Sequence, residues 1–260
     1  MKQVLARVLS NEQVMEGVIL MWFAAPEMAQ DAHPGQFCMV RCGPGFDPLL
    51  RRPLSIHRIG APHSGSSERG CALLYGVYGA AMDYLSRLAS GDTVDIIGPL
   101  GRGFAVSRSS RNLLLIAGAW GVAPLVALAE EQVKKGRAVT LLAGASTAGQ
   151  LYPDALLPPE VELVTATDDG SSGHKGPIAE LVADYWSWAD EIYASAPTFM
   201  YPALAAAVES LWPRKPVQVL AEMPMACGVG ACYACVLETK RGPKRSCRDG
   251  PRFYLHDLLL

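Results

Sequence analysis

The chain has 260 residues, of which half are apolar and 18% are charged, and its formal net charge at pH 7 is −2. This length is typical of two or three domains, and the apolar content is enough for buried cores, so disorder is excluded. The near balance of charge argues against a nucleic-acid-binding protein, which usually carries a strongly basic domain. Four of the seven cysteines lie at or after Cys227, and this clustering favours metal ligation over disulfide bonds.

Two stretches bear on membrane insertion. Charged residues interrupt the segment 2–16, so it lacks the continuous apolar run of a signal peptide. The uncharged stretch 112–129 approaches the length of a membrane span, but Gly118 and Pro124 divide it into strand, turn and helix. We therefore expect a soluble, cytoplasmic protein without membrane insertion.

Residues 1–101 show the pattern of short strands separated by turns. Apolar residues alternate at the strand period, and a Pro-Gly turn leads into the segment FCMV. A short helix is expected over 82–91, closed by Gly91. The expected strands include residues 4–8, 18–22, 37–40 and 93–101. Short strands of this kind predict a small antiparallel β-barrel.

The character of the sequence changes after residue 101. Continuous apolar runs alternate with helical stretches, including a helix expected from about Pro124 to Gly136. The runs are residues 113–118, 139–146, 161–167 and 191–196. This alternation predicts a parallel α/β domain over 102–215. Residues 216–260 follow neither pattern and form a small third region.

The strongest chemical signal is the spacing of four cysteines in this last region. Cys227, Cys232 and Cys235 are separated by four and two residues, and Cys247 follows. This is the spacing of plant-type ferredoxins, whose thiolates hold a 2Fe-2S cluster. A closed zinc site is the alternative, although histidine ligands are absent from 175–255. The basic residues around Cys247 would offset the charge of the cluster or dock an acidic partner. A solvated hairpin without such a role is the alternative interpretation.

The segment RRPLSI (51–56) follows at the end of a predicted barrel strand. An arginine and a serine on a rigid strand suit a flavin, because a guanidinium binds pyrophosphate and a hydroxyl or backbone group reaches the ring. Taken alone, an exposed turn is the alternative interpretation.

The order of these segments resembles the ferredoxin-reductase superfamily and, more narrowly, the electron-transfer subunits of NAD-dependent dihydroorotate dehydrogenase. The resemblance covers nearly the whole chain. It rests on PGQF (34–37), RRPLSI (51–56), GPLGRGF (98–104), TDDGSSGHKG (167–176) and MACGVGACYAC (225–235). It implies a flavin-binding β-barrel (1–101), an NAD-binding-like α/β domain (102–215) and a 2Fe-2S domain (216–260).

The resemblance also implies cofactor residues. The thiolates of Cys227, Cys232, Cys235 and Cys247 would hold the cluster. The FAD contacts would be Arg52, Pro53, Leu54, Ser55, Leu74, Tyr75, Gly76, Ala81 and Met82. The last two depart from the family, which has glycine and threonine there, so a hydroxyl and some backbone freedom are lost near the phosphates.

Two further departures concern NAD. The family's glycine-rich turn after the first strand of the second domain reads Gly-Gly-x-Gly-x-x-Pro, whereas this chain places Trp120 in it, between Gly118 and Gly121. The family's Cys-Gly-Pro-x-x-Met segment reads SAPTFM (195–200) here. NAD binding is therefore doubtful, and a strand–helix connection without a ligand is the alternative.

The function implied by the resemblance is electron transfer in pyrimidine biosynthesis. An FMN-containing catalytic dehydrogenase subunit, in a heterotetramer, would supply electrons that pass through the cluster and FAD to NAD or another acceptor. No side chain of this chain is expected to act as a catalytic acid, base or nucleophile. The alternatives are a related subunit of a hydrogenase or transhydrogenase, and a docking subunit that has lost NAD binding.

Overall fold

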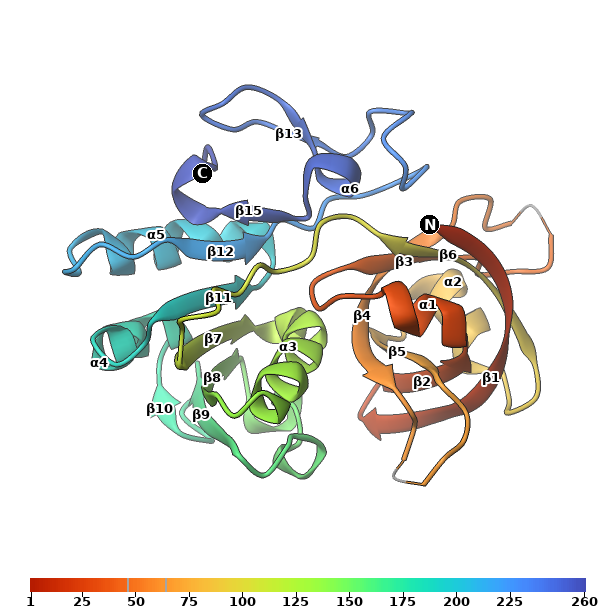
Figure 1. The fold of residues 1–260 in the computed structure, drawn as a ribbon, viewed down its shortest axis with the longest axis horizontal. Helices are drawn as coiled ribbons and strands as arrows, with labels where there is room; N and C mark the ends of the chain where they lie inside the picture. Colours follow the sequence, from red (N-terminus) through yellow and green to blue (C-terminus); the bar gives the residue numbers. More distant parts are fainter. Residues whose placement is uncertain (46, 64) are drawn as a thin grey trace.

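The computed structural model describes residues 1–45, 47–63 and 65–260, and three regions follow one another along the chain (Figure 1). The first is a closed barrel of antiparallel strands in the order β1-β2-β5-β4-β3-β6. Its strands are β1 (Lys2–Met15), β2 (Val18–Ala24), β3 (Phe37–Val40), β4 (Arg52–Gly60), β5 (Gly70–Gly76) and β6 (Thr93–Leu100). Two short helices, α1 (Pro26–Asp31) and α2 (Gly79–Ser86), belong to this region.

Strand β2 shows why the barrel and the next region pack together. Successive side chains of a strand point to opposite faces. Met21 and Phe23 accordingly lie in the barrel core, whereas Leu20 and Trp22 lie in a second apolar cluster that they share with the central region. Both faces are therefore buried, and the strand is apolar throughout.

The central region contains a sheet in the order β10-β9-β8-β7-β11-β12-β15. Every neighbouring pair is parallel except β12 and β15. The strands are β7 (Asn112–Gly118), β8 (Ala138–Ala145), β9 (Val161–Thr167), β10 (His174–Lys175), β11 (Glu191–Ser195), β12 (Val217–Leu220) and β15 (Arg252–Tyr254). The helices are α3 (Val122–Lys134), α4 (Val182–Trp186) and α5 (Tyr201–Glu209). Parallel strands need both faces covered, which explains the continuous apolar runs.

The C-terminal region is small and is anchored on the central sheet. It contains the hairpin β13 (Val236–Leu237) and β14 (Lys244–Arg245), then α6 (Ser246–Asp249). Strand β15 then pairs antiparallel with β12, Leu220 opposite Arg252. The sequence-based boundary after residue 215 assigns β12 to the third region, whereas its strand pairing places it in the central sheet.

The fold class predicted from the sequence is confirmed: an antiparallel barrel, a parallel α/β region and a small C-terminal region. Two local predictions are wrong. The helix expected over 82–91 is α2, which begins at Gly79 and ends at Ser86, because Gly79 adopts the positive φ that opens the turn into the helix. The segment RRPLSI leads into β4 at Arg52 and is not the end of a strand.

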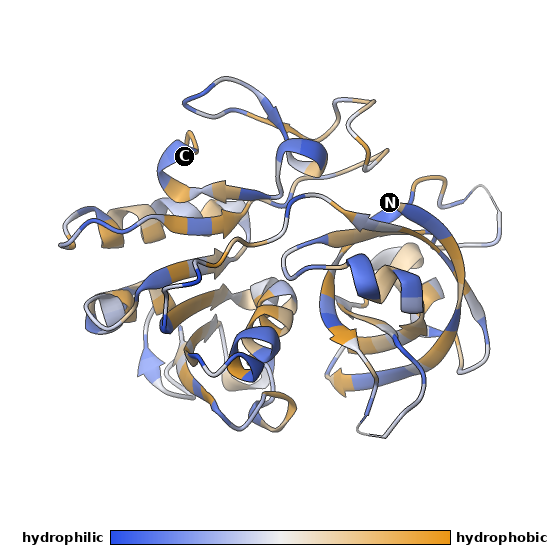
Figure 2. Cartoon of the chain, viewed as in Figure 1, coloured by the Kyte–Doolittle hydropathy of each residue, from blue (hydrophilic) through white to orange (hydrophobic). Residues whose placement is uncertain are grey.

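The distribution of hydropathy follows this architecture. Apolar residues concentrate in the strands of both sheets, and α3 is mostly apolar in its N-terminal part and hydrophilic in its C-terminal part (Figure 2). Among the described residues, no helix is both long enough and apolar enough to cross a bilayer.

Candidate functional site

The four predicted cluster ligands come together in the C-terminal region. Cys227 and Cys232 lie on the loop that follows β12, Cys235 directly precedes β13, and Cys247 lies in α6. Hydrogen bonding by Cys232 lowers the pKa of the Cys227 thiol, and the backbone N–H of Cys247 donates to Cys235 Sγ at 3.4 Å. Within the described ranges, no three ligand-type side chains converge on a point suited to a single ion. Two pairs of thiols suit a cluster of two irons, each held by two thiolates.

Backbone donors surround the first of these thiols. The N–H groups of Val229 and Ala231 donate to Cys227 Sγ at 3.4 and 3.3 Å. Burial raises the pKa of the Cys227 thiol, but hydrogen bonds from Val229, Cys232 and Ala231 outweigh it and bring this pKa below its ordinary value. Because the thiolate is the form that binds metal, the lowered pKa of Cys227 favours metal binding by this loop.

The loop conformation depends on two glycines. Gly228 and Gly230 have φ values of +71° and +83°, which side chains rarely adopt. A Cβ at Gly228 would lie 2.4 Å from Cγ of Met39 in β3. Arg245 holds the loop from the other side, since its guanidinium donates to the Gly230 carbonyl at 3.0 Å. The loop is therefore fixed both to the barrel and to the hairpin β13–β14.

The cysteines share an apolar cluster with the barrel. Cys235 and Cys247 are buried and pack in one cluster with Phe37 and Met39 of β3. In the sheet, Met39 is opposite Pro53 and Phe37 is opposite Ser55. Strand β3 therefore lies between the four thiols and the segment predicted to bind FAD. This proximity is what electron transfer between the two sites requires.

Sequence reasoning missed Glu222, which lies at the flavin segment. Ser55 donates a hydrogen bond to Oε1 of Glu222. Both residues line a small pocket with Pro53 and Met225. Glu222 is open to solvent, yet the protein atoms crowded around it raise the pKa of its carboxyl, and the Ser55 hydroxyl partly opposes that rise. No spacing motif connects residues so far apart in sequence, so only the fold reveals this pair.

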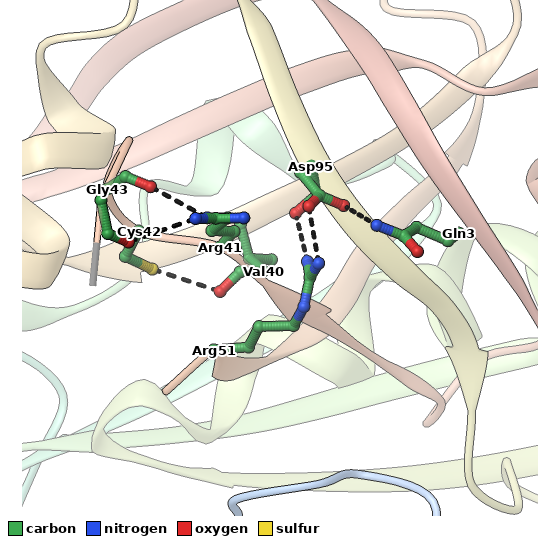
Figure 3. A network of polar contacts seen from close by, with 8 residues as sticks. Gln3, Val40, Arg41, Cys42, Gly43, Arg51 and Asp95 are labelled. Carbon is green, nitrogen blue, oxygen red and sulfur yellow. Dashed lines mark hydrogen bonds and ion pairs between the residues drawn. The ribbon is translucent and has the colours of Figure 1, made fainter. Parts of the chain in front are cut away.

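Arg51, directly before β4, and Arg52, the first residue of β4, differ in their contacts; Figure 3 shows those of Arg51. Arg51 binds Asp95 of β6 twice, with Nη2 to Oδ2 at 2.6 Å and Nη1 to the carbonyl at 2.9 Å. Gln3 donates to the other carboxylate oxygen of Asp95 at 3.0 Å. Arg52 donates only to the Leu50 carbonyl, at 3.1 Å, and forms no ion pair with a described carboxylate. Arg52 is therefore the guanidinium that remains available for a pyrophosphate.

The other predicted FAD residues can contribute little through their side chains. Tyr75 is buried in the barrel core and donates to Asn11 Oδ1 at 3.1 Å. Leu74 packs in the cluster shared with the central region, and a Cβ at Gly76 would lie 2.3 Å from the Tyr78 ring. Ala81 and Met82 lie buried in α2. Contacts from these residues to FAD would use the backbone, and they remain a prediction.

The glycine-rich turn between β7 and α3 is closely packed. A Cβ at Gly121 would lie 1.7 Å from the Ser195 carbonyl oxygen, and one at Gly118 would lie 2.8 Å from Met200 Cε. Both glycines are thus required by packing alone. The Trp120 ring makes an edge contact with Tyr78 of the barrel, with centroids 6.0 Å apart. Trp120 therefore lies at the junction of the two regions, where the resemblance puts the nicotinamide.

A buried histidine joins the barrel to α3. His57 Nδ1 lies 2.8 Å from the Ala123 carbonyl, and its Nε2 lies 3.0 Å from the Tyr152 hydroxyl. Since a carbonyl can only accept, Nδ1 carries the proton and Nε2 accepts from Tyr152. Burial lowers the pKa of His57 to about 3. His57 is therefore a neutral structural group that fixes the two regions together.

Comparison with known proteins identifies the family. Residues 222–259 match the iron-sulfur cluster binding domain of dihydroorotate dehydrogenase B. A protein of Desulforamulus reducens, the electron transfer subunit of dihydroorotate dehydrogenase B (NAD(+)), is 37% identical over 255 residues, covering 95% of each chain. The chain belongs to this family. The subunit of the same name from Geobacillus sp. (strain WCH70) is 34% identical over 265 residues, covering 100% of both chains.

The folds of solved structures agree with this family membership. The NADH-dependent reduced ferredoxin-NADP oxidoreductase structure has a TM-score of 0.82 and 26% identity, and the match covers 98% of this chain and 89% of that one. A ferredoxin NADP+ reductase from Neisseria gonorrhoeae, with bound FAD and NADP, has a TM-score of 0.63 and 15% identity over 82% of this chain and 92% of that one. The resemblance stated from the sequence is thereby confirmed.

Proposed function

We propose that this chain relays electrons from a partner dehydrogenase, through a 2Fe-2S cluster and FAD, to NAD or another acceptor. The observation that carries the proposal is the shared apolar cluster in which Cys235 and Cys247 pack against β3, directly beside the start of β4. Membership of the dihydroorotate dehydrogenase B family supports dihydroorotate as the partner's substrate and pyrimidine biosynthesis as the context.

The chain's own residues supply binding, orientation and electrostatics. A flavin exchanges one or two electrons, so it can connect a one-electron cluster with a two-electron nicotinamide. Cys227, Cys232, Cys235 and Cys247 would hold the irons. Arg52 would bind the pyrophosphate. Ser55 and Glu222 hydrogen-bond each other at the same segment and can accept or donate a proton there.

A partner subunit is part of the proposal. The relatives' name, electron transfer subunit, supports a separate catalytic subunit. By the resemblance, this would be an FMN-containing dehydrogenase in a heterotetramer. Cys232 is exposed and Cys227 is partly exposed, so one side of the predicted cluster site is open to such a partner.

A second candidate function is supported by one comparison. The NADH-dependent reduced ferredoxin-NADP oxidoreductase structure matches nearly the whole chain, so a transhydrogenase-type partner is the alternative. The two functions differ in the reductant that supplies electrons. Dihydroorotate should reduce the assembled complex under the first function, and reduced ferredoxin or NADPH under the second.

The first experiment is the visible spectrum of the purified chain before and after dithionite. Flavin bands together with an iron–sulfur absorbance that bleaches on reduction support the relay. A colourless, zinc-containing protein contradicts it and favours the closed zinc site. A colourless protein without metal favours the docking subunit.

A second experiment isolates the NAD step. Anaerobic NADH should bleach the flavin bands of the holoprotein if nicotinamide reaches the flavin despite Trp120 and Ser195. If NADH leaves the flavin oxidised while dithionite reduces it, the acceptor is not NAD. Trp120→Gly removes the indole from this turn and should speed the reaction if the indole obstructs the nicotinamide.

A further inference from the structure

A cavity of about 270 Å³ lies apart from the flavin segment, between β15, the hairpin β13–β14 and the linker that follows β6. Its walls carry four cationic side chains, two carboxylates and two aromatic rings. It shares no lining residue with the pocket of Ser55 and Glu222. On β15, Arg252 faces this cavity, while Pro251, just before the strand, faces the flavin-side pocket.

Both carboxylates of the cavity are already in ion pairs. Asp257 accepts from Arg241 Nε at 3.1 Å. Asp249 accepts from the backbone N–H of Arg245 at 2.9 Å and lies 3.5 Å from its Nε. These contacts neutralise the two acidic groups locally. Lys244 still attracts the Asp249 carboxylate, whereas Arg102 and Arg252 have no ion-pair partner among the described carboxylates.

Three cations are left over. Arg102, Lys244 and Arg252 form no ion pair with any carboxylate of the described ranges. Nε of Arg252 is buried and has no hydrogen-bond partner. A buried, charged donor without an acceptor is costly, because water is removed and nothing replaces it. An anion that enters the cavity would supply the missing acceptor.

We propose that this cavity binds a phosphate monoester. A guanidinium presents parallel N–H groups that match phosphate oxygens, so Arg252 would be the principal ligand, with Lys244 and Arg102 as neighbouring charges. Tyr254, two residues after Arg252 on the same face of β15, lines the same cavity and provides an apolar wall for the organic group. The volume is below that of pockets for drug-sized ligands and is too small for a dinucleotide.

The ligand would connect three parts of the fold. Arg102 belongs to the linker from the barrel, and its N–H donates to the Gly250 carbonyl at 2.6 Å. Lys244 belongs to the hairpin beside Cys247, and Arg252 belongs to the central sheet. Binding should therefore stabilise the holoprotein, because a ligand that binds only the folded state shifts unfolding by mass action.

The test is calorimetric titration of the cluster- and flavin-loaded chain with inorganic phosphate, ribose 5-phosphate and phenyl phosphate. The two monoesters should bind, more tightly than inorganic phosphate, and should raise the melting temperature. Arg252→Gln should weaken their binding by about tenfold or more, as expected for a charged hydrogen bond. Affinity should fall as salt is added.

Arg69→Gln is the matched control, since it removes an exposed arginine on the barrel hairpin far from the cavity. It should leave binding unchanged. An unaltered visible spectrum of Arg252→Gln separates loss of the ligand from loss of the fold or of the cluster. The proposal is overturned if no monoester binds, if inorganic phosphate binds as tightly as the monoesters, or if Arg252→Gln weakens only association with the catalytic partner.

Discussion

Ser55, near the end of the segment RRPLSI (51–56), donates a hydrogen bond to Glu222, which lies between the last parallel strand and the cysteine loop. The bond joins parts of the chain 167 residues apart. It therefore fixes the barrel to the segment that leads to the predicted cluster site. It also places one titratable group beside the position proposed for FAD.

Removal of the Ser55 hydroxyl should change the titration of Glu222. The hydroxyl donates to the carboxylate and lowers its pKa, against the rise caused by the protein atoms crowded around it. In Ser55→Ala this donor is lost, so the pKa of Glu222 should rise further. Infrared pH titration of the carboxyl band measures it, and Glu222→Gln assigns the band. An unchanged titration in Ser55→Ala would show that the bond is absent in solution.

The sequence was informative where one local rule determined the outcome. Parallel strands buried on both faces must be apolar, so the runs at 113–118 and 139–146 predicted β7 and β8. The cysteine spacing predicted a cluster because a short loop must bring Cys227, Cys232 and Cys235 to the same metal site. These predictions needed no knowledge of the tertiary fold.

The remaining features depend on contacts between distant segments. The pairing of β15 with β12 and the meeting of Ser55 with Glu222 are set by packing of whole regions, which no short window encodes. The resemblance implied Arg52 as an FAD contact, but the local sequence assigned no separate role to Arg51. Only the position of Asp95 in β6 shows that Arg51 has a carboxylate partner, whereas Arg52 has none among the described residues.

Substitution of one cluster ligand should remove the iron without removing the flavin. In Cys247→Ser the thiolate is lost from the buried pair with Cys235, so cluster absorbance and iron content should fall to near zero while flavin bands persist. Cys42→Ala is the control, because Cys42 is buried in the barrel core and is not one of the four predicted ligands. Iron lost equally from both variants would contradict the assignment of the ligands.

Stability should depend on pH through His57. The pKa of His57 is about 3 in the folded chain and ordinarily 6.5. Between these two pH values, the unfolded chain therefore binds a proton that the folded chain does not bind. The contribution is fully present above about pH 6.5 and is lost as pH falls toward 3, by up to about 1.4 kcal/mol per pH unit. Urea unfolding across this window measures it.

His57→Gln is the comparison for that measurement. It should lower stability at neutral pH by about 1–3 kcal/mol, because the hydrogen bonds to Ala123 and Tyr152 are disturbed. It should also reduce the acid slope. An identical slope in the two proteins would mean that other groups cause the acid sensitivity.

Gly121 in the β7–α3 turn should not tolerate a side chain, because the turn packs closely against β11. In Gly121→Ala the new Cβ would meet the Ser195 carbonyl oxygen at 1.7 Å, so β11 or the turn must shift, at a cost of about 1–3 kcal/mol or more. Gly149→Ala is the control, since its nearest neighbour lies at 4.0 Å. Thermal melting compares them, and equal melting temperatures would contradict the close approach of the turn and β11.

Substitutions of Arg51 and Arg52 should have different effects, the first on stability and the second on cofactor binding. Arg51→Gln removes a partly buried pair with Asp95 and leaves that carboxylate short of a donor, so unfolding free energy should fall by about 1–3 kcal/mol. Arg52→Gln breaks no ion pair with a described carboxylate, so stability of the apoprotein should change little. Its FAD affinity should fall by about tenfold or more, because a charged hydrogen bond to the pyrophosphate is lost.

The readouts are urea unfolding of the apoprotein and fluorescence titration with FAD. Arg51→Gln should mainly lower the unfolding free energy, and Arg52→Gln should mainly lower the FAD affinity. This opposite pattern distinguishes the roles of the two arginines. Arg52→Lys keeps the charge but not the paired N–H groups, so it should recover part of the affinity. If Arg52→Gln binds FAD as tightly as the parent, the pyrophosphate is held elsewhere, and the backbone of α2 becomes the segment to test.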